Sequence, residues 1–314
     1  MRRDGRLALV LLALLWAAGP SRVGGQTRAA LADNGLAFEL RGGPAQPGGV
    51  LAITVRTTRD VDGVSATAFD QTATLIRDGS SRIWRGLIGV DLAATVSSSL
   101  VVTAHLPGGG SVLTPSPLAL VPRQFPTRRL TVASRFVDPS AEELDRIRRE
   151  AARLDAIFAT VTVPDRLESF VPPLPGVPGR NFGSRSVFNG EPRAPHAGAD
   201  FPGATGMPIA APAGGRVVLA EALFFTGQTV VIDHGLGLYS LLAHLSRIDV
   251  TPGQAVARGD VVGLLGATGR VTGPHLHWTV RLNQARVDPL RLVALLAPAQ
   301  SGAVPDRLPK APVK

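Results

Sequence analysis

Histidine and aspartate side chains with the spacing of a metal site gather in one stretch of the chain. Five of the six histidines lie between positions 196 and 277 of the 314 residues. In the segment 195–201, His196 and Asp200 stand four residues apart among proline and glycine residues, which disfavour a helix. We therefore expect this pair to converge through an extended or turn conformation.

A second pair of histidines has the spacing of a strand. His275 and His277 open an apolar run that follows a Gly-Pro turn. Because side chains alternate along a strand, both imidazoles project from the same face and can address one metal ion together. His244 closes a further apolar strand, 238–243, and adds a third imidazole to the same glycine-rich region.

These residue types suit a zinc ion with an open coordination position. Two neutral imidazoles and one carboxylate supply three protein ligands and leave the fourth position for water, as in catalytic zinc sites. A structural zinc site would need four ligands, usually cysteines, and the chain has none. Four histidines and one aspartate exceed three ligands, so we expect the surplus pair to carry protons as general acid and base. The spacing alone does not divide ligands from proton carriers.

Composition excludes several other classes of protein. With 45% apolar and 18% charged residues, the chain can form folded cores, is neither disordered nor collagen-like, and is long enough for two domains. The absence of cysteine excludes a disulfide framework. The net charge of +9 favours an anionic partner. Three Trp and one Tyr offer no stacking surface for nucleic acid, so we expect no nucleic-acid binding.

Residues 1–25 have the pattern of a signal peptide. Three arginines within the first six residues precede an apolar run of 12 residues, 7–18, which is shorter than the roughly 20 residues of a membrane span. Small residues then offer a cleavage site before Gln26. We expect export to the periplasm or cell envelope with no membrane span after processing; the alternative is an uncleaved N-terminal anchor.

The rest of the chain predicts a mainly β protein in two parts joined by a helix. Short alternating runs between turns predict an Ig-like β-sandwich over residues 30–125. A capping box followed by an apolar stripe predicts a linker helix over 138–160. Short β-like runs with glycine turns predict an antiparallel β domain over 165–297, and the polar, proline-bearing residues 298–314 predict a disordered tail.

The stretch from His196 to Asp288 resembles the LytM and lysostaphin type of zinc metalloendopeptidases, which cut peptide cross-links of bacterial cell walls. The matching segments are PHAGADF (195–201), VIDHGLGLY (231–239), AHLS (243–246) and GATGRVTGPHLH (266–277). The resemblance covers nearly the whole second part of the chain. It implies that this part is the zinc metallopeptidase domain.

The resemblance also implies a role for each residue of the site. His196, Asp200 and His277 would bind one zinc ion per chain, while the catalytic residues His244 and His275 would flank the attacking water. Peptidoglycan stem peptides would be the substrate, hydrolysed at their cross-links. We expect the chain to act as a monomer.

Other residues of this region have ordinary structural interpretations. The family often has an aromatic residue two positions before its catalytic histidine, and Leu242 in that place points to an altered substrate subsite. Tyr239, five residues before His244, would face away from the site in an unbulged strand. His234 lies in a turn sequence, and we expect a structural role for it. Arg185 is a candidate either for a substrate carboxylate or for an ion pair.

Two alternatives to the endopeptidase are open. A non-catalytic murein-binding regulator that activates another hydrolase would have lost metal ligands, and this sequence keeps all of them. A zinc D-alanyl carboxypeptidase also combines two histidines and an aspartate. Such an enzyme normally has a Glu-x-x-Trp-His segment, which the sequence lacks.

Overall fold

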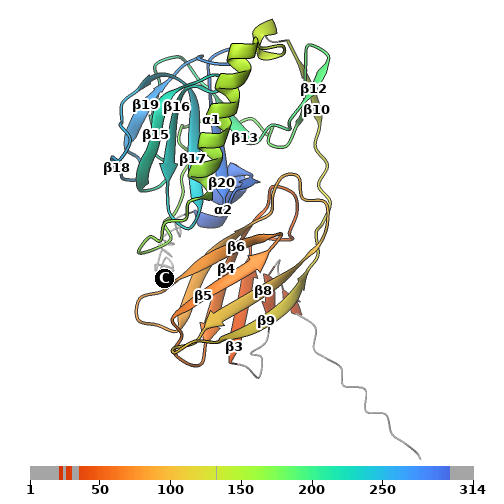
Figure 1. Ribbon diagram of the computed structural model, residues 1–314, viewed down its shortest axis with the longest axis vertical. Helices are drawn as coiled ribbons and strands as arrows, with labels where there is room; N and C mark the ends of the chain where they lie inside the picture. Colours follow the sequence, from red (N-terminus) through yellow and green to blue (C-terminus); the bar gives the residue numbers. More distant parts are fainter. Residues whose placement is uncertain (1–20, 24–25, 30–34, 132, 298–314) are drawn as a thin grey trace, which may run out of the picture.

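The computed structural model describes residues 21–23, 26–29, 35–131 and 133–297. These residues form a mainly β protein, as predicted, with two β-rich lobes (Figure 1). Of the predicted signal peptide only residues 21–23 belong to this set, and the predicted tail, 298–314, lies outside the described residues. No helix among the described residues is long and apolar enough to cross a membrane.

The N-terminal lobe is a β-sandwich, and several of its strands alternate buried and less buried side chains. In β5, for example, every second residue is buried, which is the pattern of a strand with one face on a core. The strand order is β1-β2-β3-β4-β7-β6-β5-β8-β9. The strands are β1 (Ser21–Val23), β2 (Gln26–Ala29), β3 (Leu36–Arg41), β4 (Val50–Thr57), β5 (Gly63–Ala68), β6 (Gln71–Arg77), β7 (Ile83–Gly89), β8 (Ser98–His105) and β9 (Ser111–Leu118).

The C-terminal lobe is built on a second antiparallel sheet, in the order β13-β20-β17-β16-β15-β18, with β19 beside β17, β14 beside β19 and β21 beside β20. The strands are β13 (Gly198–Pro202), β14 (Pro208–Ala210), β15 (Gly215–Leu223), β16 (Gly227–Asp233), β17 (Leu238–Ile248), β18 (Ala255–Val256), β19 (Val261–Leu265), β20 (His275–Leu282) and β21 (Ala285–Val287). The helix α2 (Pro289–Leu296) follows β21.

The two faces of this sheet have different surroundings, as the alternation of β20 shows. Leu276, Trp278 and Val280 are fully buried in the main core of the lobe. His275 and His277 project from the opposite face. The polar face therefore carries the chemistry, while the apolar face anchors the strand that presents it.

The helix α1 (Ala141–Ala159) covers an apolar part of the same face of the sheet that carries His275 and His277. A capping box between Ser140 and Glu143 opens the helix, as the sequence predicted. At the other end Phe158 packs edge-on against Tyr239 of β17, with 5.5 Å between the ring centroids. The helix is therefore a packed layer of the C-terminal lobe and not a free connector between the two lobes (Figure 1).

A small sheet ties the connection between the lobes to the C-terminal lobe. The strand β10 (Thr127–Leu130) pairs in parallel with β11 (Arg185–Phe188), which pairs in turn with β12 (Glu191–Arg193). A 3-10 helix (Ser134–Phe136) lies between β10 and α1. The segment that leaves the N-terminal sandwich thus runs beside the residues that precede His196.

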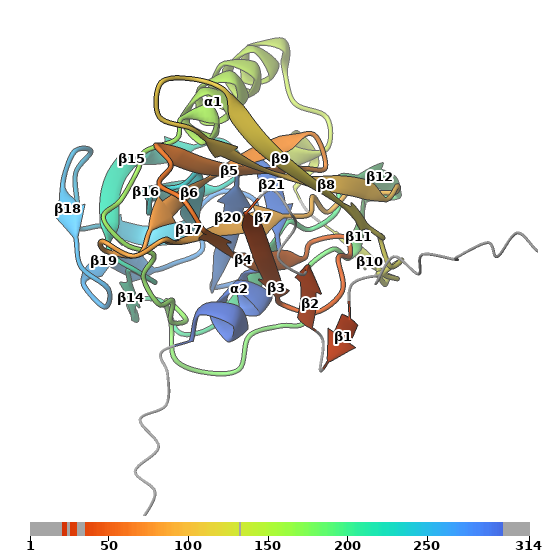
Figure 2. The same cartoon turned by 90° about the horizontal axis from the view of Figure 1, so that it is seen from below.

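Side chains of the N-terminal sandwich join the hydrophobic core of the C-terminal lobe, and an ion pair connects the two lobes. Val50, Ala52 and Leu87 of the N-terminal sandwich pack in the same cluster as the apolar residues of β20, β21 and α2. At the rim, the Arg286 guanidinium donates to both carboxylate oxygens of Asp91, at 2.6 and 3.0 Å. Figure 2 views the molecule from the side of the sandwich, with the C-terminal lobe behind it.

Candidate metal centre

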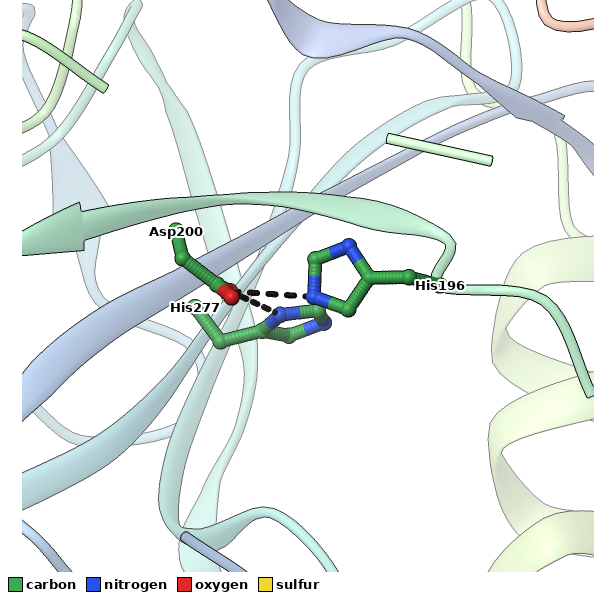
Figure 3. Close-up of side chains that lie close together, drawn as sticks. All are labelled: His196, Asp200 and His277. Atoms are coloured by element: carbon green, nitrogen blue, oxygen red, sulfur yellow. Dashed lines mark hydrogen bonds and ion pairs between the residues drawn. The ribbon is translucent and has the colours of Figure 1, made fainter. Parts of the chain in front are cut away.

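Antiparallel pairing between β13 and β20 brings together three side chains that could bind a metal ion. Asp200 and His277 are direct partners in the register of these strands, so both project from the polar face. The Asp200 Oδ1 atom lies 3.0 Å from His196 Nε2 and 2.8 Å from His277 Nδ1 (Figure 3). The ligand atoms of the three residues all lie within 4.8 Å of one another.

A glycine in β13 leaves room for one of the ligands. A Cβ atom added at Gly198 would lie 2.7 Å from His277 Cε1 and 2.6 Å from the carbonyl oxygen of Trp278. Both distances are shorter than a carbon atom tolerates, and the carbonyl belongs to the backbone. Only glycine at this position allows the His277 ring to lie against β13.

Hydrogen bonds from neighbouring residues orient two of the three ligands. The Asn181 amide donates from Nδ2 to Asp200 Oδ2 at 2.5 Å, which leaves Oδ1 facing the two imidazoles. The Thr279 hydroxyl lies 2.9 Å from His277 Nε2. Hydrogen bonds of this kind, from Asn181 and Thr279, fix the orientation of metal-binding groups. His196 Nδ1, by contrast, is buried with no hydrogen-bond partner among the described residues.

The sequence interpretation missed these supporting residues. Strand alternation places Thr279 on the same face as His277, two residues earlier, so this contact could have been expected. Asn181 lies in a loop 19 positions before its partner in the chain, and no local pattern points to it.

A β-bulge in β17 turns His244 toward the metal ligands. The strand does not end at His244, as we had expected, but continues to Ile248. His244 has a positive φ of 67°, and the pairing of β17 with β16 shifts register between Leu242 and Leu245. Leu242 and Leu245 both face the main core, so the bulge places His244 on the polar face with Ala243. Its ring centroid lies 4.9 Å from that of His275.

Backbone carbonyl groups hold both of the other histidines in one tautomer. His244 Nδ1 lies 2.8 Å from the carbonyl oxygen of Thr268, and His275 Nδ1 lies 2.8 Å from that of Gly273. A carbonyl oxygen can only accept, so each Nδ1 carries the proton and donates it. In both rings the Nε2 atom is left with a free lone pair that can accept a proton.

Burial and charge shift the pKa values of the site in opposite directions. Burial alone would raise the pKa of Asp200, but hydrogen bonds from His196 and His277, together with their charges, outweigh it and hold the carboxyl below its ordinary range. Burial and the neighbouring histidines lower the pKa of His244 to about 3. Burial also lowers the pKa of His277. The aspartate is therefore ionised and these imidazoles are neutral at pH 7, the protonation states that metal ligands and general bases need.

The donor set and its geometry fit a zinc ion. Zinc prefers imidazole nitrogen and carboxylate oxygen at about 2.0–2.2 Å in a tetrahedron, which sets its ligand atoms about 3.3 Å apart. The two contacts of Asp200 Oδ1, at 3.0 and 2.8 Å, need only a small expansion to reach this value. Three ligands leave one coordination position open, as in catalytic sites.

A cavity of about 160 Å³ opens over these side chains. Its walls come from β10, β11, β13, β17, β20, the loop between β15 and β16 and the loop between β19 and β20. The lining residues are Arg128, Leu130, Ser184, Ser186, Phe188, His196, Asp200, Phe225, Thr226, His244, Arg270, Val271, Thr272, His275 and His277. All five residues selected from the sequence thus meet at one cavity. A wider cavity of about 1260 Å³ lies beside Glu168 and Arg258; the described residues place no comparable group of metal ligands there.

Leu242 and Tyr239 lie away from the cavity. Leu242 is fully buried in the core and paired with Trp278, so it forms no substrate subsite, and that expectation was wrong. Tyr239 lies outside the site for a different reason from the one proposed. The strand is bulged, and Tyr239 faces α1, where its hydroxyl donates to the carbonyl oxygen of Thr160 at 2.7 Å.

The remaining two candidates have different surroundings. His234 donates from Nδ1 to the Gly214 carbonyl oxygen at 2.8 Å, and its Nε2 accepts from the Ser240 hydroxyl at 2.9 Å. These contacts give it a structural place beside the main core. Arg185 is exposed at the start of β11 and is not among the residues that line the cavity.

Comparison with known proteins agrees with this geometry. Residues 194–289 match the family described as peptidase family M23. The chain is 42% identical over 98 residues to the peptidoglycan DD-endopeptidase ShyA of Vibrio cholerae, a match that covers 31% of this chain and 23% of that protein. It is 40% identical over 103 residues to the DD-carboxypeptidase/endopeptidase Mpg of Neisseria meningitidis, covering 33% of this chain and 24% of that protein. The match thus spans about a quarter of the length of each of these relatives.

A solved structure resembles more of the chain. The crystal structure of an M23-type protein from Pseudomonas aeruginosa is 32% identical and superposes with a TM-score of 0.61. The match covers 80% of this chain and 95% of that one. This share is larger than the C-terminal lobe alone can supply, so the likeness includes the N-terminal sandwich.

Proposed function

This chain belongs to peptidase family M23, and we propose that it is an exported zinc-dependent endopeptidase that hydrolyses peptide cross-links of bacterial peptidoglycan. The observation that carries the proposal is the meeting of His196, Asp200 and His277 at one cavity with two further imidazoles. The names of the relatives from Vibrio cholerae and Neisseria meningitidis support the choice of substrate. The expected location is the periplasm or cell envelope.

In this proposal His196 Nε2, Asp200 Oδ1 and His277 Nδ1 hold the zinc ion. Zinc bound there supplies Lewis acidity to a peptide carbonyl group and to water. The contacts of Asn181 and Thr279 orient two of these ligands, Asp200 and His277. Hydrogen bonds from His196 and His277 lower the pKa of Asp200, so the aspartate is ionised and offers the metal a full negative charge.

His244 and His275 handle the protons of the reaction. Each ring is fixed by its Nδ1–H bond to a backbone carbonyl oxygen, so its Nε2 atom faces the cavity ready to accept a proton from the attacking water. The same nitrogen, once protonated, can return that proton to the leaving amine. The protonated ring also places a hydrogen-bond donor near the oxyanion that develops on the scissile carbonyl group. Such assistance accelerates hydrolysis by about 10²- to 10⁴-fold.

The two alternatives find less support. A regulator without activity has no need of an intact ligand set, and this chain keeps its three ligands, their hydrogen-bond partners and both proton carriers. A carboxypeptidase would use the same zinc chemistry, and one relative's name includes this activity. The same assay distinguishes it, because a carboxypeptidase releases terminal D-alanine and leaves the cross-linked dimers whole.

Digestion of purified cross-linked sacculi tests the proposal. The full chain loaded with zinc is expected to convert dimeric muropeptides to monomers, as measured by liquid chromatography and mass spectrometry. His244→Ala serves as the matched control, since it removes one proton carrier and leaves the ligands in place. If the dimers persist under conditions where an established endopeptidase removes them, the chain is not a cross-link endopeptidase.

A further inference from the structure

Two arginines line the cavity that contains the candidate metal ligands. Arg128 comes from β10 and Arg270 from the loop that precedes β20. Asp200 is the one acidic residue among the lining residues, and the metal would use its charge. The walls of the cavity are therefore cationic, and they favour an anionic group of the ligand.

Aromatic rings hold the Arg270 guanidinium in a defined place. It lies 4.4 Å from the ring centroid of Phe225 and 4.8 Å from that of Phe188, and both rings line the cavity. Its backbone N–H donates to the Phe225 carbonyl oxygen at 2.8 Å, which fixes the loop at the same point. Stacking on two rings orients the planar guanidinium while leaving its N–H groups for a ligand.

Arg270 lacks the acidic partner that a structural arginine normally has. Within the described residues no ion pair or side-chain hydrogen bond involves its guanidinium. Burial lowers the pKa of Arg270, and the positive charge of Arg193 lowers it further. Arg281 provides a contrast inside the same lobe. It also lies over a ring, that of Phe158, but it donates to the Gln284 carbonyl oxygen, and it is not a lining residue of the cavity.

We propose that Arg270 binds a carboxylate group of the substrate on the residue that follows the scissile peptide bond. This inference rests on the proposed peptidase function and names the feature of the peptide that the site recognises. The cavity is small compared with the roughly 300–1,000 Å³ of typical ligand sites. A group that reaches Arg270 must therefore belong to a residue next to the bond held at the ligands. A guanidinium matches a carboxylate with two parallel hydrogen bonds.

Peptide binding measured without turnover tests this inference. The parent is the full zinc-loaded chain carrying His275→Ala, in which hydrolysis is expected to be slowed by about 10²- to 10⁴-fold. The probes are a stem pentapeptide ending in D-Ala-D-Ala with a free carboxyl terminus and the same peptide with a C-terminal amide. Calorimetry gives the dissociation constant of each probe for the parent and for the parent with Arg270→Gln. Comparing the two probes on the two variants is a double-mutant cycle, which isolates the interaction between the Arg270 side chain and the terminal carboxylate of the peptide.

Amidation of the probe is expected to weaken binding to the parent by about 10- to 100-fold, the usual effect of losing a hydrogen bond between charged groups. In Arg270→Gln the same amidation is expected to change binding by less than about threefold. Arg247→Gln removes one positive charge from an exposed residue paired with Asp249 and is expected to keep the full effect of amidation.

Two results would overturn the inference. One is that amidation does not weaken binding to the parent. The other is that amidation weakens binding to Arg270→Gln as much as it weakens binding to the parent, which would mean that another group binds the carboxylate. If circular dichroism shows that Arg270→Gln is unfolded, Arg270→Met keeps an unbranched side chain over the two rings and is judged by the same criteria. Digestion of sacculi by the unaltered chain reports on the proposed function separately, so the two failures are distinguishable.

Discussion

Replacement of Asn181 by alanine is expected to weaken zinc binding although Asn181 is not a ligand. Its amide donates the 2.5 Å hydrogen bond to Asp200 Oδ2, and the Asp200 side chain is only 22% exposed, so water replaces this bond poorly. A hydrogen bond to a charged group contributes about 1.5–3 kcal/mol. Since about 1.4 kcal/mol corresponds to a tenfold change, we expect the dissociation constant for zinc to rise by about 10- to 100-fold.

Competition with a chromophoric chelator measures this change directly. Gln254→Ala is a suitable control, because it removes another amide that accepts a hydrogen bond, from the backbone N–H of Thr251, and it does not line the cavity. The control is expected to bind zinc like the unaltered chain. If Asn181→Ala binds zinc within about twofold of the unaltered chain while remaining folded, the contact does not orient the ligand, and the reasoning from outer hydrogen bonds is wrong.

Three further predictions concern the other histidines and the glycine of β13. His244→Ala is expected to lose at least about 100-fold in hydrolysis of sacculi yet retain one zinc per chain by mass spectrometry; loss of the metal would instead make His244 a ligand. Burial lowers the pKa of His234 to about 4 from its usual value near 6.5, so its contribution to stability is complete above pH 6.5 and is lost as the pH falls toward 4. Urea unfolding of the zinc-free chain measures how much larger its free energy of unfolding is than that of His234→Gln. This difference is expected to shrink by roughly 3 kcal/mol between pH 7 and pH 4. A difference that does not depend on pH would contradict the structural assignment of His234. Gly198→Ala is expected to lower stability by about 1–3 kcal/mol and to weaken zinc binding, because the methyl group meets His277; calorimetric melting with and without zinc tests both effects.

Local patterns predicted the parts of this protein that depend on neighbours in the chain. The alternation of His275 and His277 follows from the strand period, and the capping box at Ser140 marks the start of α1. Neither pattern indicates which other part of the chain packs against the strand or the helix. The apolar stripe of α1 indicates that the helix is covered on one side, but only the fold places that side on β17.

The convergence of the site depends on features that the chain order does not reveal. Asp200 meets His277 through a register between strands separated by 77 positions. His244 reaches the site through a bulge at a residue that is not glycine, where a positive φ is uncommon. Asn181 and Arg270 act from loops, whose course is set by tertiary contacts.

The sandwich has a hydrophobic core of its own, and three of its residues also complete the core of the C-terminal lobe. Truncation that removes the sandwich would expose the apolar residues of β20, β21 and α2 that now pack against Val50, Ala52 and Leu87, and it would leave Arg286 without Asp91. An isolated C-terminal fragment would then expose an apolar surface of the kind that promotes aggregation. The sandwich thus covers an apolar surface of the C-terminal lobe, and a fragment without it is expected to aggregate more readily than the full chain.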